Sequence, residues 1–322
     1  MKRIKVEHCG SPSVMTVEEF SLPEPDFGNA RVKIMASGVN FIDVYRRSGA
    51  YLSSLPLYMG SEGSGIVEAV GTNPQGIKIG DRVSWTGLNG SYATHGIFPI
   101  DKLVPLPDLL DFQQGAACML QGMTAHYLSC STYPIQPKDT CLIHAGAGGV
   151  GQLLCQIAKL KRAFVIATVS TEEKKKIAKE AEADEIILYT QTDFEHEVKK
   201  ITDGKGVQVV YDSVGKQTFD KSLNCLAKRG YLVLFGQSSG AVPPLDPQVL
   251  NAKGSLYLTR PKLDDYIESR QDLLWRSGAI FNWIASGKLN LTIDKIFHLE
   301  EAAAAHEYLE TRKTKGKVLL IP

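Results

Sequence analysis

The stretch CLIHAGAGGVG, residues 141–151, decides the fold of this chain. Its apolar start predicts a buried strand, and residues 152–160 have the apolar spacing of a helix. Between them, Gly146, Gly148 and Gly151 form the pattern G-x-G-x-x-G. Glycine lets the backbone turn sharply, and the first N–H groups of a helix attract anions. The stretch therefore predicts a loop for the pyrophosphate of a dinucleotide; the alternative is a glycine-rich turn that binds nothing.

The same alternation of strand and helix continues around this loop. Strands are expected at residues 140–145, 163–169, 185–188, 207–211 and 231–235, and helices at 150–160 and 172–181. Alternating strands and helices are typical of right-handed βαβ units. Residues 140–235 therefore predict a doubly wound parallel sheet, the Rossmann type of α/β fold.

The two ends of the chain have a different pattern. The first 120 residues are rich in strand signals, such as those at 30–36, 65–70 and 82–85. After Pro261 we expect a long helix at 263–285, a strand at 292–297, a helix at 300–309 and a strand at 317–321. The predicted domains are therefore 1–124 (first part of a β-rich domain), 125–261 (nucleotide-binding domain) and 262–322 (second part of the β-rich domain).

Composition excludes several classes of protein. The chain has 322 residues and a formal net charge of +1, with acidic and basic residues interspersed, so nothing favours nucleic-acid binding. There is no run of about 18 apolar residues that could span a membrane. The six cysteines are scattered, which argues against a disulfide scaffold and a zinc knuckle. A reducing cytoplasm is the expected location.

The end of the second predicted strand indicates which dinucleotide is bound. NAD sites usually place an Asp or Glu there to bind the ribose 2′-hydroxyl. Here the strand ends in Ser170 and Thr171, with Lys174 one helical turn later. Hydroxyls and an ammonium suit a 2′-phosphate, which a carboxylate would repel. The sequence therefore favours NADPH, although Glu172 and Glu173 in the same turn weaken the argument.

Several motifs together resemble one enzyme family. They are ASGVNFID at 36–43, GDRV at 80–83, HAGAGGVG at 144–151, YDSVG at 211–215 and FGQSSG at 235–240. In combination they resemble the zinc-free medium-chain dehydrogenases/reductases. Residues 259–261 (TRP), with Leu263 and Tyr266, narrow the resemblance to the quinone oxidoreductase branch, which includes zeta-crystallin. The resemblance covers essentially the whole chain.

The resemblance implies a GroES-like catalytic domain, a Rossmann domain, a cleft between them, and a homo-oligomer, commonly a dimer formed along the edge of the Rossmann sheet. It places Asn40 and Tyr45 beside the nicotinamide, and Thr124 against the same ring. It assigns the rest of the cofactor site to the phosphate loop, the adenosine phosphate pocket, two strand ends and a C-terminal contact: Gly146, Gly148, Gly149, Val150, Gly151, Ser170, Lys174, Tyr189, Ser213, Phe235, Gly236, Ser238 and Arg312. At Gly146 relatives more often have alanine, a change expected only to loosen the loop.

The resemblance also implies that no metal is bound. Zinc-dependent relatives use a Cys on the loop that here holds Asn40, and a His before a Glu where this chain has Ser61 and Glu62. The four-cysteine structural lobe is absent too, since residues 85–99 contain no Cys. A zinc site that activates an alcohol needs about three protein ligands. We therefore expect metal-independent chemistry.

The expected reaction is the transfer of reducing equivalents from NADPH to a quinone held in the cleft. The hydride chemistry belongs to the cofactor, and the protein orients the reactants. Asn40, Tyr45 and Tyr51 are the predicted catalytic residues, although Tyr51 could equally be a packing residue. Two alternatives stay open: an NADPH-dependent reductase of enones or alkenals, and a non-catalytic NADPH-binding protein, which could bind nucleic acid.

Other polar residues have simpler interpretations. His144 is expected to be a packed strand residue, and His95 and His126 have no partners at metal-ligand spacing. Asp43 is expected to be a buried structural carboxylate rather than an acid. Three cysteines in apolar runs are expected to be small core residues: Cys118, Cys141 and Cys155.

Overall fold

The computed structural model describes residues 1–311 and 313–322. The chain divides into two compact units. The first comprises Met1–Met123, Ile267–Gly287 and Leu291–Pro322, and the second comprises Thr124–Tyr266 and Lys288–Asn290. The predicted domain boundaries after residues 124 and 261 remain a proposal.

The second unit is built on a parallel sheet with the strand order β11-β10-β9-β12-β13-β14. The strands are β9 (Thr140–Ile143), β10 (Phe164–Val169), β11 (Glu185–Leu188), β12 (Val207–Asp212), β13 (Leu226–Leu234) and β14 (Tyr257–Thr259). All five neighbouring pairs are parallel. The chain moves outward from β9 to β11 and then returns to the other side of β9. The predicted doubly wound sheet is confirmed.

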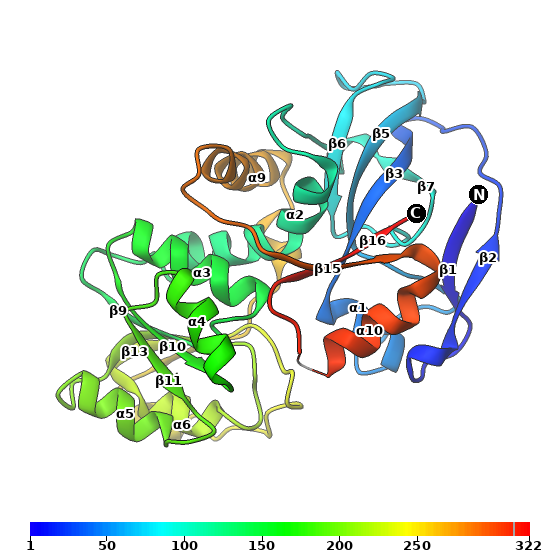
Figure 1. Ribbon diagram of the computed structural model, residues 1–322. Helices are drawn as coiled ribbons and strands as arrows, with labels where there is room; N and C mark the ends of the chain where they lie inside the picture. Colours follow the sequence, from blue (N-terminus) through cyan, green and yellow to red (C-terminus); the bar gives the residue numbers. More distant parts are fainter. Residues whose placement is uncertain (312) are drawn as a thin grey trace. The chain divides into compact units, whose positions relative to one another are not determined.

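Helices cover both faces of this sheet. α3 (Gly149–Leu160) and α4 (Glu172–Glu180) pack against strands β9–β11, and α5 (Phe194–Ile201) and α6 (Phe219–Asn224) pack against strands β11–β13. Figure 1 shows the two pairs on opposite sides of the strands. This arrangement explains why the strands are almost wholly apolar: a parallel sheet is buried on both faces. The unit also contains α7 (Gln248–Ala252), α8 (Leu263–Tyr266) and a π-helical turn, Leu128–Thr132.

The first unit is mainly antiparallel. Its large sheet has the order β15-β16-β3-β5-β6-β8, with β7 also pairing with β3, and a small sheet has the order β2-β1-β4. The long central strands are β3 (Asn29–Val39) and β5 (Glu62–Val70). The others are β1 (Lys2–Val6), β2 (Met15–Glu19), β4 (Leu57–Tyr58), β6 (Arg82–Thr86), β7 (His95–Pro99), β8 (Val104–Pro105), β15 (Ile293–His298) and β16 (Lys317–Ile321).

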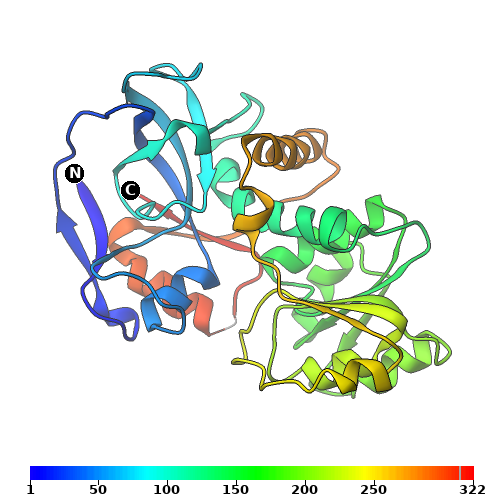
Figure 2. The ribbon, with the colours of Figure 1, turned by 180° about the vertical axis from the view of Figure 1, so that it is seen from behind.

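The helices of the first unit are α1 (Phe41–Ser48), α9 (Arg270–Ala285) and α10 (Ala302–Glu310). α10 packs against α1 and β16, as Figure 2 shows from behind. α2 (Phe112–Tyr127) contains the boundary residue between the units. The single helix predicted at 263–285 is wrong: α8 ends at Tyr266, and α9 begins after Ser269, whose hydroxyl accepts the backbone N–H of Asp272. A hydroxyl N-cap of this kind starts a new helix.

Candidate functional site

The predicted cofactor residues of the second unit gather at one edge of its sheet. Each group follows the carboxyl end of a strand: the glycine loop after β9, Ser170 after β10, Tyr189 after β11, Ser213 after β12 and residues 235–238 after β13. Parallel strands end at the same edge, so these five loops are neighbours. The strand order reverses between β9 and β12, and ligands of open α/β sheets bind at such a reversal.

The glycine loop makes a tight backbone turn that side chains at some of its positions would prevent. Ala145 has a φ of 52°, and the N–H of Gly148 donates to its carbonyl at 2.8 Å. A Cβ on Gly151 would lie 2.2 Å from the same carbonyl oxygen. α3 then starts at Gly149, with Gly148 as an N-cap that has no side chain to bond the first N–H groups. A helix start without a side-chain cap suits an anion, so the residues present fit a pyrophosphate.

Gly146 packs more tightly than the sequence predicts. A Cβ at this position would lie 2.7 Å from the Cβ of Ala167 on β10, and real Cβ atoms almost never approach so closely. The expectation that alanine at 146 would differ only in the looseness of the loop is therefore wrong, because the methyl group of Ala167 already fills that space.

His144 is a buried structural residue, as predicted. Its side chain is 1% exposed; Nδ1 lies 2.9 Å from the hydroxyl of Thr168, and Nε2 lies 2.9 Å from that of Ser222. The ring also meets Phe194 edge to face. Burial lowers the pKa of His144, so the ring is neutral and joins neighbouring strands and α6.

Asp212, which the sequence reasoning missed, organises the loops after β12 and β13. One carboxylate oxygen accepts the backbone N–H groups of Val214 and Gly215 at 2.8 and 3.0 Å, and the other accepts two hydroxyls. The backbone N–H of Ser238 donates to Ser213 O at 3.2 Å, so the predicted loops are directly linked. Aspartate at a strand end, followed by glycine, was the available signal.

The end of β10 has the polar groups expected for an adenosine phosphate pocket. The hydroxyl of Thr171 accepts the backbone N–H of Lys174 at 3.2 Å and caps α4. Ser170 O accepts the hydroxyl of Thr190, and the backbone N–H of Tyr189 donates to Val169 O. Ser170, Lys174 and Tyr189 are thus brought to one corner of the second unit. Thr171 serves the helix start.

Two further cofactor predictions are Thr124 and Arg312. Thr124 is on α2 and is 7% exposed. Arg312 lies outside the described residues.

The two predicted tyrosines of the first unit lie together. Tyr45 is on α1, and Tyr51 follows that helix. Their ring centroids are 5.0 Å apart at an interplanar angle of 45°, and the backbone N–H of Tyr51 donates to Tyr45 O at 3.0 Å. The α1 terminus at Gly49, with a φ of 83°, reverses the chain so that the rings can meet. The two rings pack against each other, and the Tyr45 ring also packs against Phe41.

Asn40 faces a buried ion pair that the sequence reasoning did not foresee. Its amide nitrogen donates to Glu62 Oε1, and its amide oxygen accepts the Lys317 ammonium, both at 2.7 Å. Lys317 and Glu62 are fully buried and bonded to each other, and Glu62 Oε2 accepts the backbone N–H of Leu120. Both amide atoms of Asn40 are thus used inside the protein. The buried ammonium here would repel a second cation.

Asp43 is buried and fully bonded, as predicted. It is 1% exposed, and its oxygens accept hydrogen bonds from Ser61, Tyr92 and the backbone N–H of Asn40. Burial raises the pKa of Asp43 to about 6, although these donors and the charge of Lys317 lower it.

The three cysteines that were predicted to be core residues are confirmed as buried: Cys118, Cys141 and Cys155. In the described part of the chain, no three His, Cys, Asp or Glu side chains gather closely enough to hold a metal ion. Within residues 1–311 and 313–322, no helix has the length and apolar character needed to cross a membrane.

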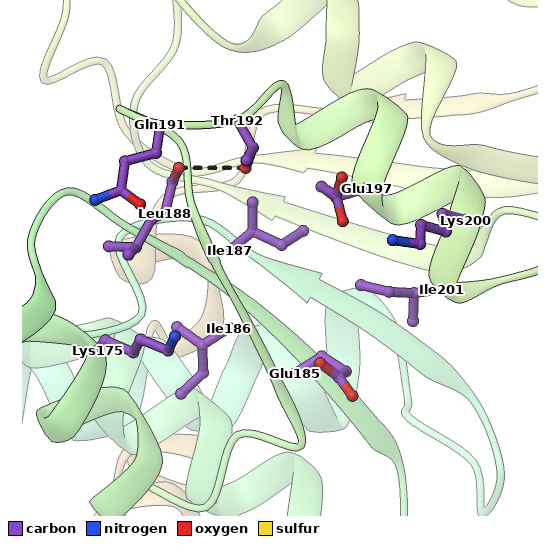
Figure 3. Close-up of a pocket in the computed structure, with 10 residues that line it drawn as sticks. All are labelled: Lys175, Glu185, Ile186, Ile187, Leu188, Gln191, Thr192, Glu197, Lys200 and Ile201. Atoms are coloured by element: carbon purple, nitrogen blue, oxygen red, sulfur yellow. Dashed lines mark hydrogen bonds between the residues drawn. The ribbon is translucent and has the colours of Figure 1, made fainter.

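A separate pocket of about 470 Å³ lies in the second unit, along β11 between α4 and α5 (Figure 3). Its floor is apolar, from Ile186, Ile187 and Ile201, and its rim has both charges, from Lys175 and Glu197 among others. Of the predicted site residues that the structure describes, none lines it. Through Gln191 and Thr192 it reaches the loop that follows β11, but it contains no residue predicted to bind the cofactor.

Two family models match this chain. Residues 26–108 match the alcohol dehydrogenase GroES-like domain, and residues 181–320 match the model described as zinc-binding dehydrogenase. The first match lies in the β-rich unit, which confirms the predicted GroES-like fold class. The second begins within the parallel-sheet unit and ends in β16.

Relatives match along the full length. The chain is 44% identical over 325 residues to quinone oxidoreductase 1 of Escherichia coli, covering 99% of both chains. It is 39% identical to a 2-haloacrylate reductase of a Burkholderia species, covering 97% of this chain and 96% of the relative. The crystal structure of the Escherichia coli quinone oxidoreductase complexed with NADPH superposes with a TM-score of 0.98, at 44% identity and 100% coverage of both chains. The chain therefore belongs to the zinc-free quinone oxidoreductase branch of the medium-chain dehydrogenase/reductase family.

Proposed function

We propose that this protein is an NADPH-dependent quinone oxidoreductase that works without a metal ion. The observation that carries the proposal is the carboxyl edge of the parallel sheet, where a glycine loop, a lysine-bearing helix start and two linked loops are neighbours. Full-length relatives named as quinone oxidoreductases, one of them crystallised with NADPH, support the same function.

Each part of the edge has a proposed role. Gly146 to Gly151 hold the pyrophosphate against the start of α3, where backbone N–H groups and the helix dipole favour negative charge. Ser170, Lys174 and Tyr189 bind the adenosine 2′-phosphate. Ser213 and residues 235–238 line the nicotinamide side, with Thr124 and Arg312 as further contacts.

The cofactor supplies a hydride when it is bound, and the protein supplies orientation. Tyr45 and Tyr51 are proposed to hold the quinone ring by stacking and by phenol hydrogen bonds. The amide atoms of Asn40 are already hydrogen-bonded to Lys317 and Glu62. Asn40 is therefore proposed to act at the quinone site through its backbone and by holding these two side chains in place. A quinone needs no metal, because its reduction produces no alkoxide that a Lewis acid must stabilise.

The proposal extends to assembly and location. A homodimer is supported by the family resemblance and by β14, the three-residue outer strand, on which Tyr257 is 47% exposed. Cytoplasmic location is supported by the six free cysteines. With a formal net charge of +1, neither nucleic acid nor a membrane surface is a proposed partner.

Sequence identity to the relatives favours quinone reduction over enone reduction. The relative at 44% is a quinone oxidoreductase, and the relative named for haloacrylate stands at 39%. The test is a steady-state screen with NADPH against ortho-quinones, para-quinones and enones. Saturable turnover of a quinone supports the proposal. Saturable turnover of enones alone would replace it with the enone reductase. Tight NADPH binding without any turnover would make the protein a cofactor-binding module.

A further inference from the structure

Asp43 is the centre of a buried polar network in the first unit. Three donors converge on its carboxylate: the Ser61 hydroxyl at 2.5 Å, the Tyr92 hydroxyl at 3.0 Å and the backbone N–H of Asn40 at 3.0 Å. They come from the start of β5, the segment before β7 and the start of α1. A carboxylate with no proton can accept all three, because each oxygen has two lone pairs.

Beyond Tyr92, each hydrogen bond of the network has a defined donor and acceptor. Because Tyr92 donates to Asp43, its oxygen accepts from His306 Nε2, 3.2 Å away on α10. His306 Nδ1 must then be unprotonated, and it lies 3.3 Å from the Arg47 guanidinium, which can only donate. Arg47 is itself paired with Glu310. The donors therefore run from Arg47 through His306 and Tyr92 toward Asp43.

The other ionisable groups near Asp43 keep one charge state in the pH range of the proposed effect. On its other side lies the ion pair of Lys317 and Glu62. Burial and the Arg47 charge lower the pKa of His306 to about 3, so this ring is neutral in ordinary buffers. Burial and the Asp43 charge raise the pKa of Tyr92 well above its usual range, so it stays protonated. The Arg46 guanidinium donates to the Ser61 hydroxyl at 3.4 Å.

We propose that Asp43 is a positioning residue whose ionised carboxylate fixes the first turn of α1, and with it Tyr45, in the orientation that binds substrate. The part of this inference that concerns substrate binding rests on the proposed function. A proton on the carboxyl would remove the negative charge that strengthens these three hydrogen bonds, and the hydroxyls of Ser61 and Tyr92 could rotate away from it. The backbone N–H of Asn40 cannot rotate, so the turn before Tyr45 is the part that loosens.

The proposal predicts an acid limit, that is, a pH below which the site loses affinity for its substrate. Since burial raises the pKa of Asp43 to about 6, the carboxylate is ionised at neutral pH and protonated below that value. Binding of substrate should therefore weaken below about pH 6, whereas the cofactor loops of the second unit contain no part of this network.

The experiment measures kcat/KM for 1,2-naphthoquinone at saturating NADPH from pH 5 to pH 8. For the wild type we expect a fall through about pH 6, with no parallel change in KM for NADPH. Asp43→Asn should lose about tenfold at pH 7.5, the scale of a misplaced binding group, and should show no acid limit. Asp108→Asn, which removes a fully exposed carboxylate, is the control and should keep the wild-type profile.

Tyr92→Phe provides a second variant that keeps the ring volume and removes one donor. Losing that hydrogen bond raises the pKa of Asp43, so the acid limit should move to higher pH. An unmoved limit in Tyr92→Phe, or an Asp43→Asn variant with the wild-type limit and wild-type neutral activity, overturns the proposal. If Asp43→Asn does not fold, the shift in Tyr92→Phe decides.

A measurement without turnover separates this proposal from the proposed function. In protein labelled with 13C-tyrosine, the Tyr45 ring signal, assigned by Tyr45→Phe, should titrate with a midpoint near pH 6 and should not titrate in Asp43→Asn. If it titrates in an enzyme that reduces no quinone, the function fails and the coupling stands. If quinone is reduced and Tyr45 does not respond, the coupling fails.

Discussion

Tyr45 is held by its ring contact with Tyr51, with centroids 5.0 Å apart, and by its place on α1. Tyr45→Phe keeps the ring and removes one hydrogen bond to substrate. Because the hydride belongs to the cofactor, the variant should still reduce quinone. The activation barrier should rise by roughly 1–2 kcal/mol, so that the rate falls about tenfold. Steady-state kinetics measure this. A Tyr45→Phe variant with the wild-type rate would remove Tyr45 from the substrate site.

Gly146 makes a prediction about packing. Gly146→Ala places a methyl group 2.7 Å from the Cβ of Ala167, so it should lower the free energy of unfolding by about 1–3 kcal/mol. Urea denaturation measures the change. Gly278→Ala is a matched control, because nothing lies within 4 Å of its new Cβ, and this helical site should gain about 0.5–1 kcal/mol.

The double variant decides whether Ala167 is the cause. Adding Ala167→Gly to Gly146→Ala removes the obstructing methyl group, so the two changes should be non-additive and the pair should recover part of the loss. A Gly146→Ala variant as stable as the wild type would show that the loop relaxes at no cost.

Single residues differ in how much of their role can be predicted from sequence. The glycines at 146, 148 and 151 were identified because a local pattern carries their conformational requirement. Lys317 was missed because its partner, Glu62, lies 255 positions away, and nothing local distinguishes a buried lysine from an exposed one. Asn40 was predicted to be a catalytic residue, but the buried ion pair uses its amide atoms, which a sequence cannot reveal.

At the scale of elements, the spacing of apolar residues predicted the positions of strands better than it predicted interruptions within strands and helices. β11 has the predicted bounds, Glu185–Leu188, because its apolar run is bounded on both sides by polar residues. β13 begins at Leu226, five residues before the predicted start, since its exposed Lys228 and Arg229 interrupt the apolar pattern. The helix predicted at 263–285 breaks at residues 267–269, where a serine cap overrides continued helical spacing.

α1 makes a prediction about stability and pH. The folded pKa of Asp43, about 6, is above the usual 3.8, so the native state binds more protons between these values. Stability from this group is therefore fully present below pH 3.8 and is lost as pH rises through 6. Relative to Asp43→Asn, the wild type should gain about 1 kcal/mol of unfolding free energy between pH 7 and pH 5.

Denaturation of both proteins at each pH measures this difference, and the comparison cancels the other titrating groups. A wild type that gains no stability over Asp43→Asn in this interval would mean that the carboxyl is not strained by burial in the native protein.

At the scale of the whole molecule, the sequence predicted the class of both units. Alternating strands and helices determine a doubly wound sheet almost completely, because parallel strands need helical crossovers. The β-rich unit was less predictable. Its sheet joins β3 and β5 to β16 from the far end of the chain, and such pairings leave no local signal.

Metal independence is a prediction at the same scale. The buried ammonium of Lys317 beside Asn40 and Glu62 disfavours a cation there. After exhaustive chelation, quinone reduction should keep its full rate, as measured by the same steady-state assay. Stoichiometric zinc by elemental analysis together with loss of turnover on chelation would contradict this.

The most direct test of the account is the ratio of kcat/KM for NADPH to that for NADH with a quinone acceptor. Ser170 and Lys174 follow β10, and Tyr189 follows the neighbouring strand β11; at the end of β10 an NAD site would usually have a carboxylate. Lys174→Ala should cost NADPH on the order of 1.5–3 kcal/mol, roughly ten- to a hundredfold, with little effect on NADH. Lys175→Ala, a neighbouring lysine that lines the separate pocket, should keep the wild-type ratio. We predict a strong preference for NADPH that collapses in Lys174→Ala; a wild type that uses NADH as well as NADPH would contradict the account.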